Sequence, residues 1–205
     1  NYLRNVDYVK CADDVFIRKG EVVPGLKEKV LGRLGLPLFV KPTDGGSSFG
    51  VVKVKKEEEF DEAVRTAFSE GKMILAEKFI PGRELTDAVY FNGKEVVALP
   101  VIEIVTDHEF FDYDAKYNGC SEEICPARLS DGLTARIQEA SKKIYARLGC
   151  SGVVRVDYIL SGEDLYFLEI NTIPGMTSAS LVPKMVKAAG MDMTDFLTEI
   201  IEGGL

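Results

Sequence analysis

The sequence has a single histidine, His108, and four cysteines that form no C-x-x-C pair. One histidine is too few for a histidine-rich zinc site, although a carboxylate site for a hard cation is still allowed. The cysteines are too sparse for a disulfide-bonded scaffold, so we expect reduced thiols and a cytoplasmic protein.

Long apolar runs and long basic runs are also missing. No apolar run is long enough to cross a bilayer, and the N-terminus has no signal-peptide pattern. The formal net charge is −8, from 33 acidic and 25 basic residues. These features argue against a membrane or a nucleic acid as partner. The chain starts at Asn1 without an initiator methionine, so we expect a fragment of a longer protein.

Two patterns alternate along the chain, which is 46% hydrophobic and can bury one sizeable core or two small ones. Apolar runs predict strands, and apolar residues at helical spacing predict helices, two of which end at Gly71 and Gly149. Asn92-Gly93 and the stretch SGED predict hairpin turns. The predicted strands cover 36–42, 51–56, 73–80, 152–160 and 165–171, with two more within 85–104; the predicted helices cover 57–70, 134–148, 180–189 and 194–202.

These elements predict a mixed α/β (α+β) chain with mostly antiparallel sheets. Pro81-Gly82 interrupts the pattern, so we expect a small lobe over residues 1–80 and a larger one over 81–205. A cleft between two lobes is a common place for a ligand. The segment 106–132 has little periodicity and is typical of a lid or a disordered loop.

Polar residues stand inside the second predicted hairpin, where a half-buried charge is costly unless it is paired. A turn at Gly162-Glu163 puts Asp157 opposite Leu168 or Glu169, and Asn171 shares the strand face of Glu169. Carboxylate and amide oxygens suit Mg²⁺. The alternative is a solvated sheet face that carries ordinary polar residues. The presence of three such residues beside a glycine-bearing turn favours the cation site over this alternative.

Two further stretches favour a nucleotide. In KPTDGGSSFG, Lys41 ends an apolar strand and needs an anion, while glycines and serines after it offer N–H and hydroxyl donors to phosphate. A plain hairpin turn is the alternative there. In AEKFIPGRE, Glu77, Lys78 and Glu84 suit a base and ribose. In FFDYDAKYNG, aromatics surround Lys116, which suits a lid that excludes water.

Taken in order, VKPTDGGSSFGV, AEKFIPGREL, FFDYDAKY, RVDYIL and LEINTIPGMTSASLVPK resemble the ATP-grasp family, and within it the D-alanine–D-alanine ligases. The resemblance covers nearly the whole chain from Leu36 onward, and the last two motifs together are highly specific. It implies the ATP-grasp fold, with two lobes and a nucleotide cleft between them.

The resemblance also implies roles for the matching residues. Asp157, Glu169 and Asn171 would hold two Mg²⁺ ions, for which Mn²⁺ is an alternative. Arg155, Gly175, Lys116, Ser47 and Tyr117 would form the catalytic set. For the nucleotide, the resemblance implies contacts from Lys41, Lys78, Glu77 and Glu84, a phosphate-covering loop with Ser47 and Ser48, and a contact of Lys116 with the γ-phosphate. Tyr117 would lie in the lid beside the amino-acid sites. Arg155 and the backbone N–H of Gly175 would form the oxyanion site, and Ser180 and Leu181 would receive the carboxylate of the second D-alanine.

The activity implied by the resemblance is ATP-dependent joining of two D-alanines through an acyl phosphate, for peptidoglycan precursor synthesis. The family carries an N-terminal domain that this sequence lacks, so we expect the fragment alone not to complete the reaction. Asp44-Gly45 also departs from the larger or charged residues of many members. Three alternatives are another carboxylate–amine ligase, a D-alanine–D-lactate ligase and a non-catalytic nucleotide-binding fragment. A homodimer of the parent protein is left open.

Overall fold

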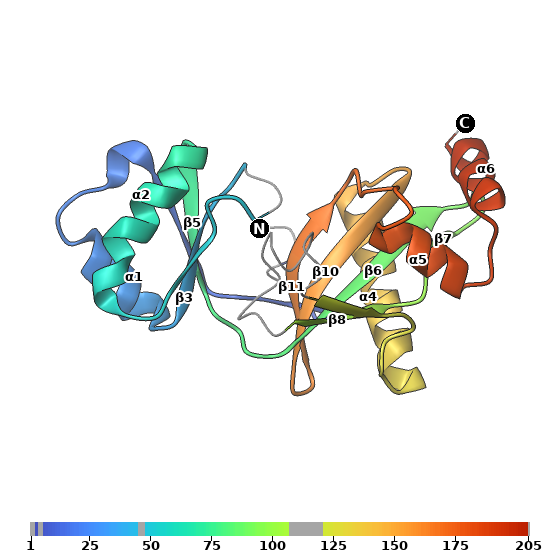
Figure 1. Ribbon diagram of the computed structural model, residues 1–205, viewed down its shortest axis with the longest axis horizontal. Helices are drawn as coiled ribbons and strands as arrows, with labels where there is room; N and C mark the ends of the chain where they lie inside the picture. The colour runs from blue at the N-terminus through green and yellow to red at the C-terminus, as the bar shows by residue number, and fades with distance from the viewer. Residues whose placement is uncertain (1–2, 4–5, 45–47, 107–120, 205) are drawn as a thin grey trace. The chain divides into compact units, whose positions relative to one another are not determined.

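The computed structural model describes residue 3 and residues 6–44, 48–106 and 121–204. These residues form two compact units (Figure 1). The smaller unit holds residues 12–80, and the larger unit holds the described residues up to Cys11, from Pro81 to Thr106, and from Ser121 onward. No helix in the described part of the chain is both long and apolar enough to span a membrane.

The smaller unit is a four-stranded antiparallel sheet in the order β2-β5-β3-β4. Strand alternation sends Leu38, Val40 and Ala76 to one face, where they form a buried core with residues of α1 and α2. Its elements are β2 (Asp14–Arg18), η1 (Lys19–Glu21), α1 (Leu26–Leu34), β3 (Leu38–Pro42), β4 (Val52–Val54), η2 (Glu57–Glu59), α2 (Phe60–Glu70) and β5 (Met73–Lys78).

The larger unit is a seven-stranded sheet in the order β1-β11-β10-β6-β8-β9, with β7 paired to β6. Its pairs are antiparallel except for β1 beside β11, which is parallel. Its elements are β1 (Lys10–Cys11), β6 (Arg83–Phe91), β7 (Val96–Ala98), β8 (Ile102–Thr106), β9 (Ser121–Ile124), α4 (Asp131–Leu148), β10 (Val153–Ser161), β11 (Asp164–Asn171), α5 (Leu181–Ala188) and α6 (Met193–Gly203).

Helix α4 packs on one face of this sheet, and the opposite face carries polar side chains as well as the buried Tyr90, which packs against Phe196 of α6. Ile137 and Ile144 of α4 are fully buried against β6 and β10 residues such as Leu85 and Val156. Because successive residues of a strand point to opposite faces, the neighbours Glu84, Thr86, Arg155 and Asp157 face away from α4. These four polar residues therefore lie on the face opposite the α4 core.

One acid, Asp87, lies on the core side of β6. Its residue is 0% exposed, and its carboxyl oxygens make no normal hydrogen bond with the described residues. Burial raises the pKa of Asp87 to about 8, an effect that a polar contact with Ser141, the charge of Lys142 and the backbone of Ala88 offset only in part. Nearby, the hydroxyls of Ser141 and Tyr158 lie 2.8 Å apart. At neutral pH, Asp87 is therefore a protonated, uncharged acid.

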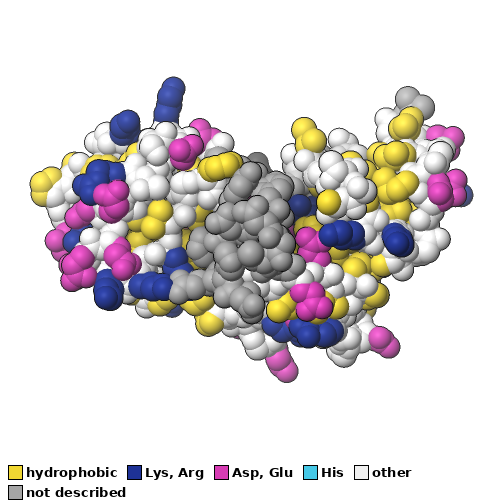
Figure 2. Space-filling model, viewed as in Figure 1, with side chains coloured by type: hydrophobic (Ala, Val, Ile, Leu, Met, Phe, Trp, Pro, Cys, Tyr) yellow, Lys and Arg dark blue, Asp and Glu magenta, His cyan; other side chains and the backbone are white. Residues whose placement is uncertain are grey.

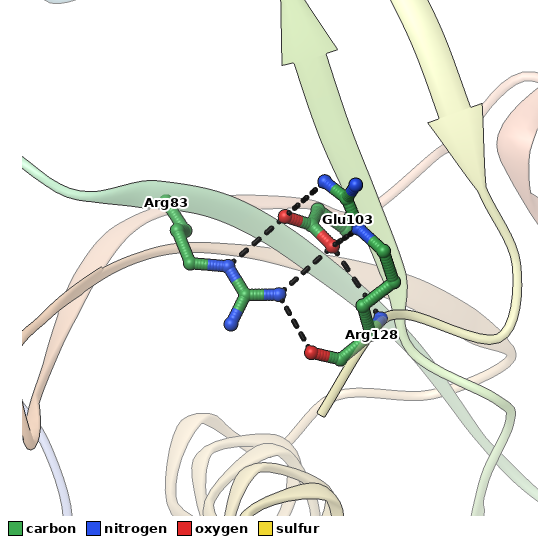
Figure 3. Close-up of polar contacts among 3 residues, drawn as sticks. All are labelled: Arg83, Glu103 and Arg128. Atoms are coloured by element: carbon green, nitrogen blue, oxygen red, sulfur yellow. Dashed lines mark hydrogen bonds and ion pairs between the residues drawn. The ribbon is translucent and has the colours of Figure 1, made fainter. Parts of the chain in front are cut away.

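A second buried acid, Glu103 of β8, is paired on both sides (Figure 3). Arg83 Nε donates to Glu103 Oε1 at 2.9 Å, and Arg128 Nε donates to Glu103 Oε2 at 2.9 Å. Arg83 Nη2 also donates to the carbonyl oxygen of Arg128 at 2.9 Å. Hydrogen bonds from Arg128 and Arg83 lower the pKa of Glu103 to about 2. This ion cluster ties β6 and β8 to the segment after β9. On the face of the protein shown in Figure 2, acidic and basic side chains are interspersed.

The structure confirms the mixed α/β class, the mostly antiparallel pairing and both hairpins. Helix α4 ends at Gly149 with a φ of 63°, as the sequence predicts. The region expected to hold two strands contains three, because the pairing of this segment with β6 stops after Leu99, where Pro100 has no N–H to donate. Strand β2 and helix α1 were not foreseen. The division into lobes at 1–80 and 81–205 stays a prediction. Residues 10–11, which it assigned to the smaller lobe, pair with β11 of the larger sheet.

Candidate active site

A β-bulge in the β10–β11 hairpin sets the register of the candidate metal ligands. Near the turn, Ser161 pairs with Asp164 and Tyr158 pairs with Phe167. A regular ladder would then put Leu168 opposite Asp157, but the register shifts and Glu169 takes that position. Opposite residues of a pair share a face, so the extra residue brings Glu169 and Asn171 to the face of Asp157. The sequence prediction of Leu168 or Glu169 as the partner is confirmed for Glu169.

Asp157 is the centre of this face and is only 7% exposed. Arg155 holds it with two parallel bonds, Nε to Oδ1 and Nη2 to Oδ2, each 2.8 Å long. Asn171 Nδ2 donates to Asp157 Oδ2 at 3.0 Å and to Glu169 Oε1 at 3.4 Å. Thr86, directly opposite Asp157 on β6, donates from Oγ1 to Oδ1 at 2.5 Å. The carboxylate is thus surrounded by hydrogen-bond donors from three side chains.

Arg155 supplies the positive charge of the cluster. Burial alone would lower the pKa of its guanidinium, but the hydrogen bonds to Asp157 and the negative charges of Asp157, Glu169 and Glu84 outweigh burial and raise that pKa. The guanidinium is therefore cationic at every physiological pH. Its side chain is 17% exposed, so part of it is open to solvent beside the carboxylates.

The donor set fits a hard divalent cation. Two carboxylates and one amide on a single sheet face provide the oxygen ligands that Mg²⁺ prefers. Within the described residues, no three His, Cys, Asp or Glu side chains cluster in a way that could hold a metal ion. A site here would therefore depend on Asp157 and Glu169, with the Asn171 oxygen and groups of the substrate completing it. The three residues are brought together, and their role as metal ligands stays a prediction.

In the smaller unit, the structure gives Lys41 an anionic partner. Its Nζ lies 2.7 Å from Glu77 Oε2, and the two side chains are 21% and 12% exposed. Glu77 is therefore the anionic partner that a half-buried Lys41 requires. The contact of Lys41 with a phosphate stays a prediction. On the same sheet face, Lys53 lies 3.9 Å from the Phe79 ring centroid, which adds a cation–π contact.

Other nucleotide candidates lie apart from this pair or outside the described residues. Lys78 follows Glu77 on β5, so its side chain starts on the opposite face of the strand. Ser48 has a φ of 61°, an uncommon conformation for a residue with a side chain. Ser47, Lys116 and Tyr117 lie outside the described residues.

The loop after β11 is folded around the Ser180 hydroxyl. Thr177 N donates to Ser180 Oγ at 3.1 Å, and the two hydroxyl oxygens lie 2.8 Å apart. A Cβ on Gly175 would lie 2.7 Å from Ser180 Oγ, so a residue with a side chain at this position would displace the Ser180 hydroxyl. Leu181 opens α5 with a buried side chain, and its role in receiving a carboxylate stays a prediction.

One member of the carboxylate cluster was missed from the sequence. Thr86 is 0% exposed and contacts Asp157 directly, although nothing in the sequence singled it out. The available signal was strand alternation, because Thr86 is two residues after Glu84 and must share its face. The pairing of β6 with β10, which puts Thr86 opposite Asp157, joins segments about 70 residues apart and had no sequence signal.

Comparisons of the sequence and of the structure with known proteins both find ligases that act on D-alanine. Residues 5–202 match the family model "D-ala D-ala ligase C-terminus". The D-alanine–D-alanine ligase of Bacteroides fragilis is 49% identical over 195 residues, which are 95% of this chain and 60% of that protein. The crystal structure of the VanG D-Ala:D-Ser ligase of Enterococcus faecalis matches with a TM-score of 0.84 and 34% identity, over 96% of this chain and 57% of that one.

A third match is a complex. The D-alanine–D-alanine ligase of Bacillus anthracis in complex with ATP has a TM-score of 0.74 and 32% identity, over 96% of this chain and 59% of that one. The chain thus spans about 60% of the length of the curated relatives it matches. The ATP-grasp expectation for the fold is confirmed by these structures. The chain belongs to the family of D-alanine–D-alanine ligase C-terminal domains.

Proposed function

We propose that the full-length protein containing this chain joins two D-alanines in an ATP-dependent reaction that passes through an acyl phosphate. The product would be the dipeptide used for peptidoglycan precursors, made in the cytoplasm. This chain would supply the nucleotide phosphate and metal sites. The observation that carries the proposal is the single sheet face that presents Asp157, Glu169 and Asn171 beside the cationic Arg155.

Asp157, Glu169 and Asn171 would hold Mg²⁺, which neutralises charge on the phosphoryl oxygens when it is bound. The bulge-dependent register aims both carboxylates at one place, so their charges add there. Arg155 is held by Asp157 and stays cationic, which suits it to the oxyanion that forms when the second amine attacks the acyl phosphate. The ATP complex of the Bacillus anthracis ligase supports ATP as the phosphoryl donor.

Within the smaller unit, Lys41 would contact the phosphates and Glu77 would hold it in place when they are absent. The pair is mostly buried, so the lysine is oriented before a nucleotide binds. Around the amino acids, Gly175 would offer its N–H to the oxyanion, while the Ser180 hydroxyl and the start of α5 would receive the carboxylate of the second D-alanine. The tight loop around Ser180 Oγ supports this role, because it fixes the hydroxyl at the helix N-terminus.

The experiment that tests this function measures phosphate release by the full-length protein containing this chain. With ATP, Mg²⁺ and D-alanine, we expect steady phosphate release and the D-alanyl-D-alanine dipeptide, and with L-alanine we expect neither. D-serine and D-lactate, offered with D-alanine, separate the related ligases. Phosphate release that needs D-serine or D-lactate as the second substrate would replace this assignment, and ATP turnover independent of D-alanine would remove it.

A further inference from the structure

The two carboxylate oxygens of Asp157 are held in different ways. Oδ2 accepts from Arg155 Nη2 at 2.8 Å and from Asn171 Nδ2 at 3.0 Å. Oδ1 accepts from Arg155 Nε at 2.8 Å and from the hydroxyl of Thr86 at 2.5 Å. Asn171 also reaches Glu169, so Oδ2 is the oxygen on the side of the other candidate ligands.

The partners of Oδ2 are able to give way to a cation. The guanidinium of Arg155 lies at the end of a long side chain that is partly open to solvent, and rotation of the outer bonds of this side chain frees the Asp157 carboxylate. Turning the Asn171 amide over replaces its NH₂ group with an oxygen, which changes a donor into a metal ligand. Both movements leave the backbone of the hairpin in place.

Thr86 has no such freedom. Its residue is 0% exposed and lies in the middle of β6, paired directly with Asp157 of β10. A hydroxyl has one proton to donate, and the other acceptor in reach, the carbonyl oxygen of Val156, is farther away at 3.4 Å. The short bond to Oδ1 is therefore the one that the proton makes. It fixes the carboxylate plane from a buried, rigid position.

We propose that Thr86 is a positioning residue for the metal site: its hydroxyl anchors Oδ1 of Asp157 and thereby presents Oδ2 toward Glu169 and Asn171 for a divalent cation. This inference rests on the proposed function, because it assumes that the carboxylate pair binds Mg²⁺. Groups that orient a metal ligand without touching the metal commonly change metal affinity by about 10- to 100-fold when they are removed.

The test measures divalent-cation affinity rather than activity. Free Mn²⁺ is followed by electron paramagnetic resonance during titration of the full-length protein containing this chain, saturated with a non-hydrolysable ATP analogue. Thr86→Val keeps the shape of the side chain and loses the hydroxyl, and Thr86→Ser keeps the hydroxyl and loses a methyl. We expect Thr86→Val to weaken Mn²⁺ binding by about 10-fold or more, and Thr86→Ser to keep affinity close to that of the unchanged protein.

The variants separate the possible failures. Folding of each variant is checked by circular dichroism. If the Thr86→Val protein does not fold, Thr86→Ala takes its place, because it also removes the hydroxyl. Equal loss in Thr86→Ser and Thr86→Val would overturn the inference, because packing and not the hydroxyl would then be responsible. Normal affinity in both Thr86→Val and Thr86→Ala, with loss in Asp157→Asn, would overturn it while the metal site stands. Normal affinity in Asp157→Asn and Glu169→Gln would remove the metal site itself.

Discussion

Replacing Glu169 with glutamine is expected to cut turnover of the full-length protein by about 100-fold or more at limiting Mg²⁺, because a metal supplies several kcal/mol of charge stabilisation in phosphoryl transfer. Glutamine keeps the size of the side chain and removes one of the two negative charges on the site. Glu169 is exposed at the end of β11, so the fold has little need of its charge. The measurement is phosphate release at a series of Mg²⁺ concentrations.

A matched control for this change is present in the same hairpin. Glu163→Gln removes the same charge at the exposed turn between β10 and β11, away from Asp157. We expect Glu163→Gln to leave the Mg²⁺ dependence unchanged. If Glu169→Gln also left it unchanged, Glu169 would be a surface residue of the hairpin and the two-carboxylate site would be wrong.

Replacing Asp87 with asparagine is expected to stabilise the larger unit near neutral pH. Because the folded pKa of Asp87 is raised to about 8, the folded state keeps a proton that the unfolded state releases above pH ~4. Stability is therefore lost as the pH rises from about 4 toward about 8, and the loss reaches up to about 4 kcal/mol at pH 7. The buried amide of asparagine costs about 1–3 kcal/mol of its own, so a net gain of about 1–3 kcal/mol remains.

Urea unfolding followed by circular dichroism checks this at several pH values. The advantage of Asp87→Asn over the unchanged protein should grow by about 1.4 kcal/mol per pH unit between pH 5 and pH 7 and become constant above about 8. Glu163→Gln, at an exposed position, should show no such slope. An advantage independent of pH would mean that Asp87 is ionised in the folded protein and that the description of its environment is wrong.

Local signals predicted much of the fold, because each of them acts over a few residues. Helix α4 follows from its apolar spacing and the stop at Gly149, and both hairpins follow from their turns. The N-terminal region was predicted poorly. Strand β2 is short, with Phe16 exposed, and its pairing partner β5 lies about 60 residues away, so its identity depends on contacts that a local pattern does not contain.

The candidate site shows the same division. The sequence indicated the convergence of Asp157, Glu169 and Asn171, because a single short turn relates them. It left the choice between Leu168 and Glu169 open, because a one-residue bulge has no reliable sequence signature. Thr86 and Asp87 were missed for a common reason. Both lie on β6, where only the pairing with β10 and the packing of α4 decide which residues face Asp157 and which face the core.

We propose that the sheet face of Asp157, Glu169 and Asn171 binds divalent cations that hold the nucleotide phosphates. Crystals grown with Mn²⁺ and a non-hydrolysable ATP analogue locate those cations through the anomalous scattering of manganese. We predict an anomalous peak within ligand distance of Asp157 Oδ2 and the Glu169 carboxylate, next to the phosphates. A bound nucleotide with manganese elsewhere, or with no peak at the β10–β11 hairpin, would contradict the claim.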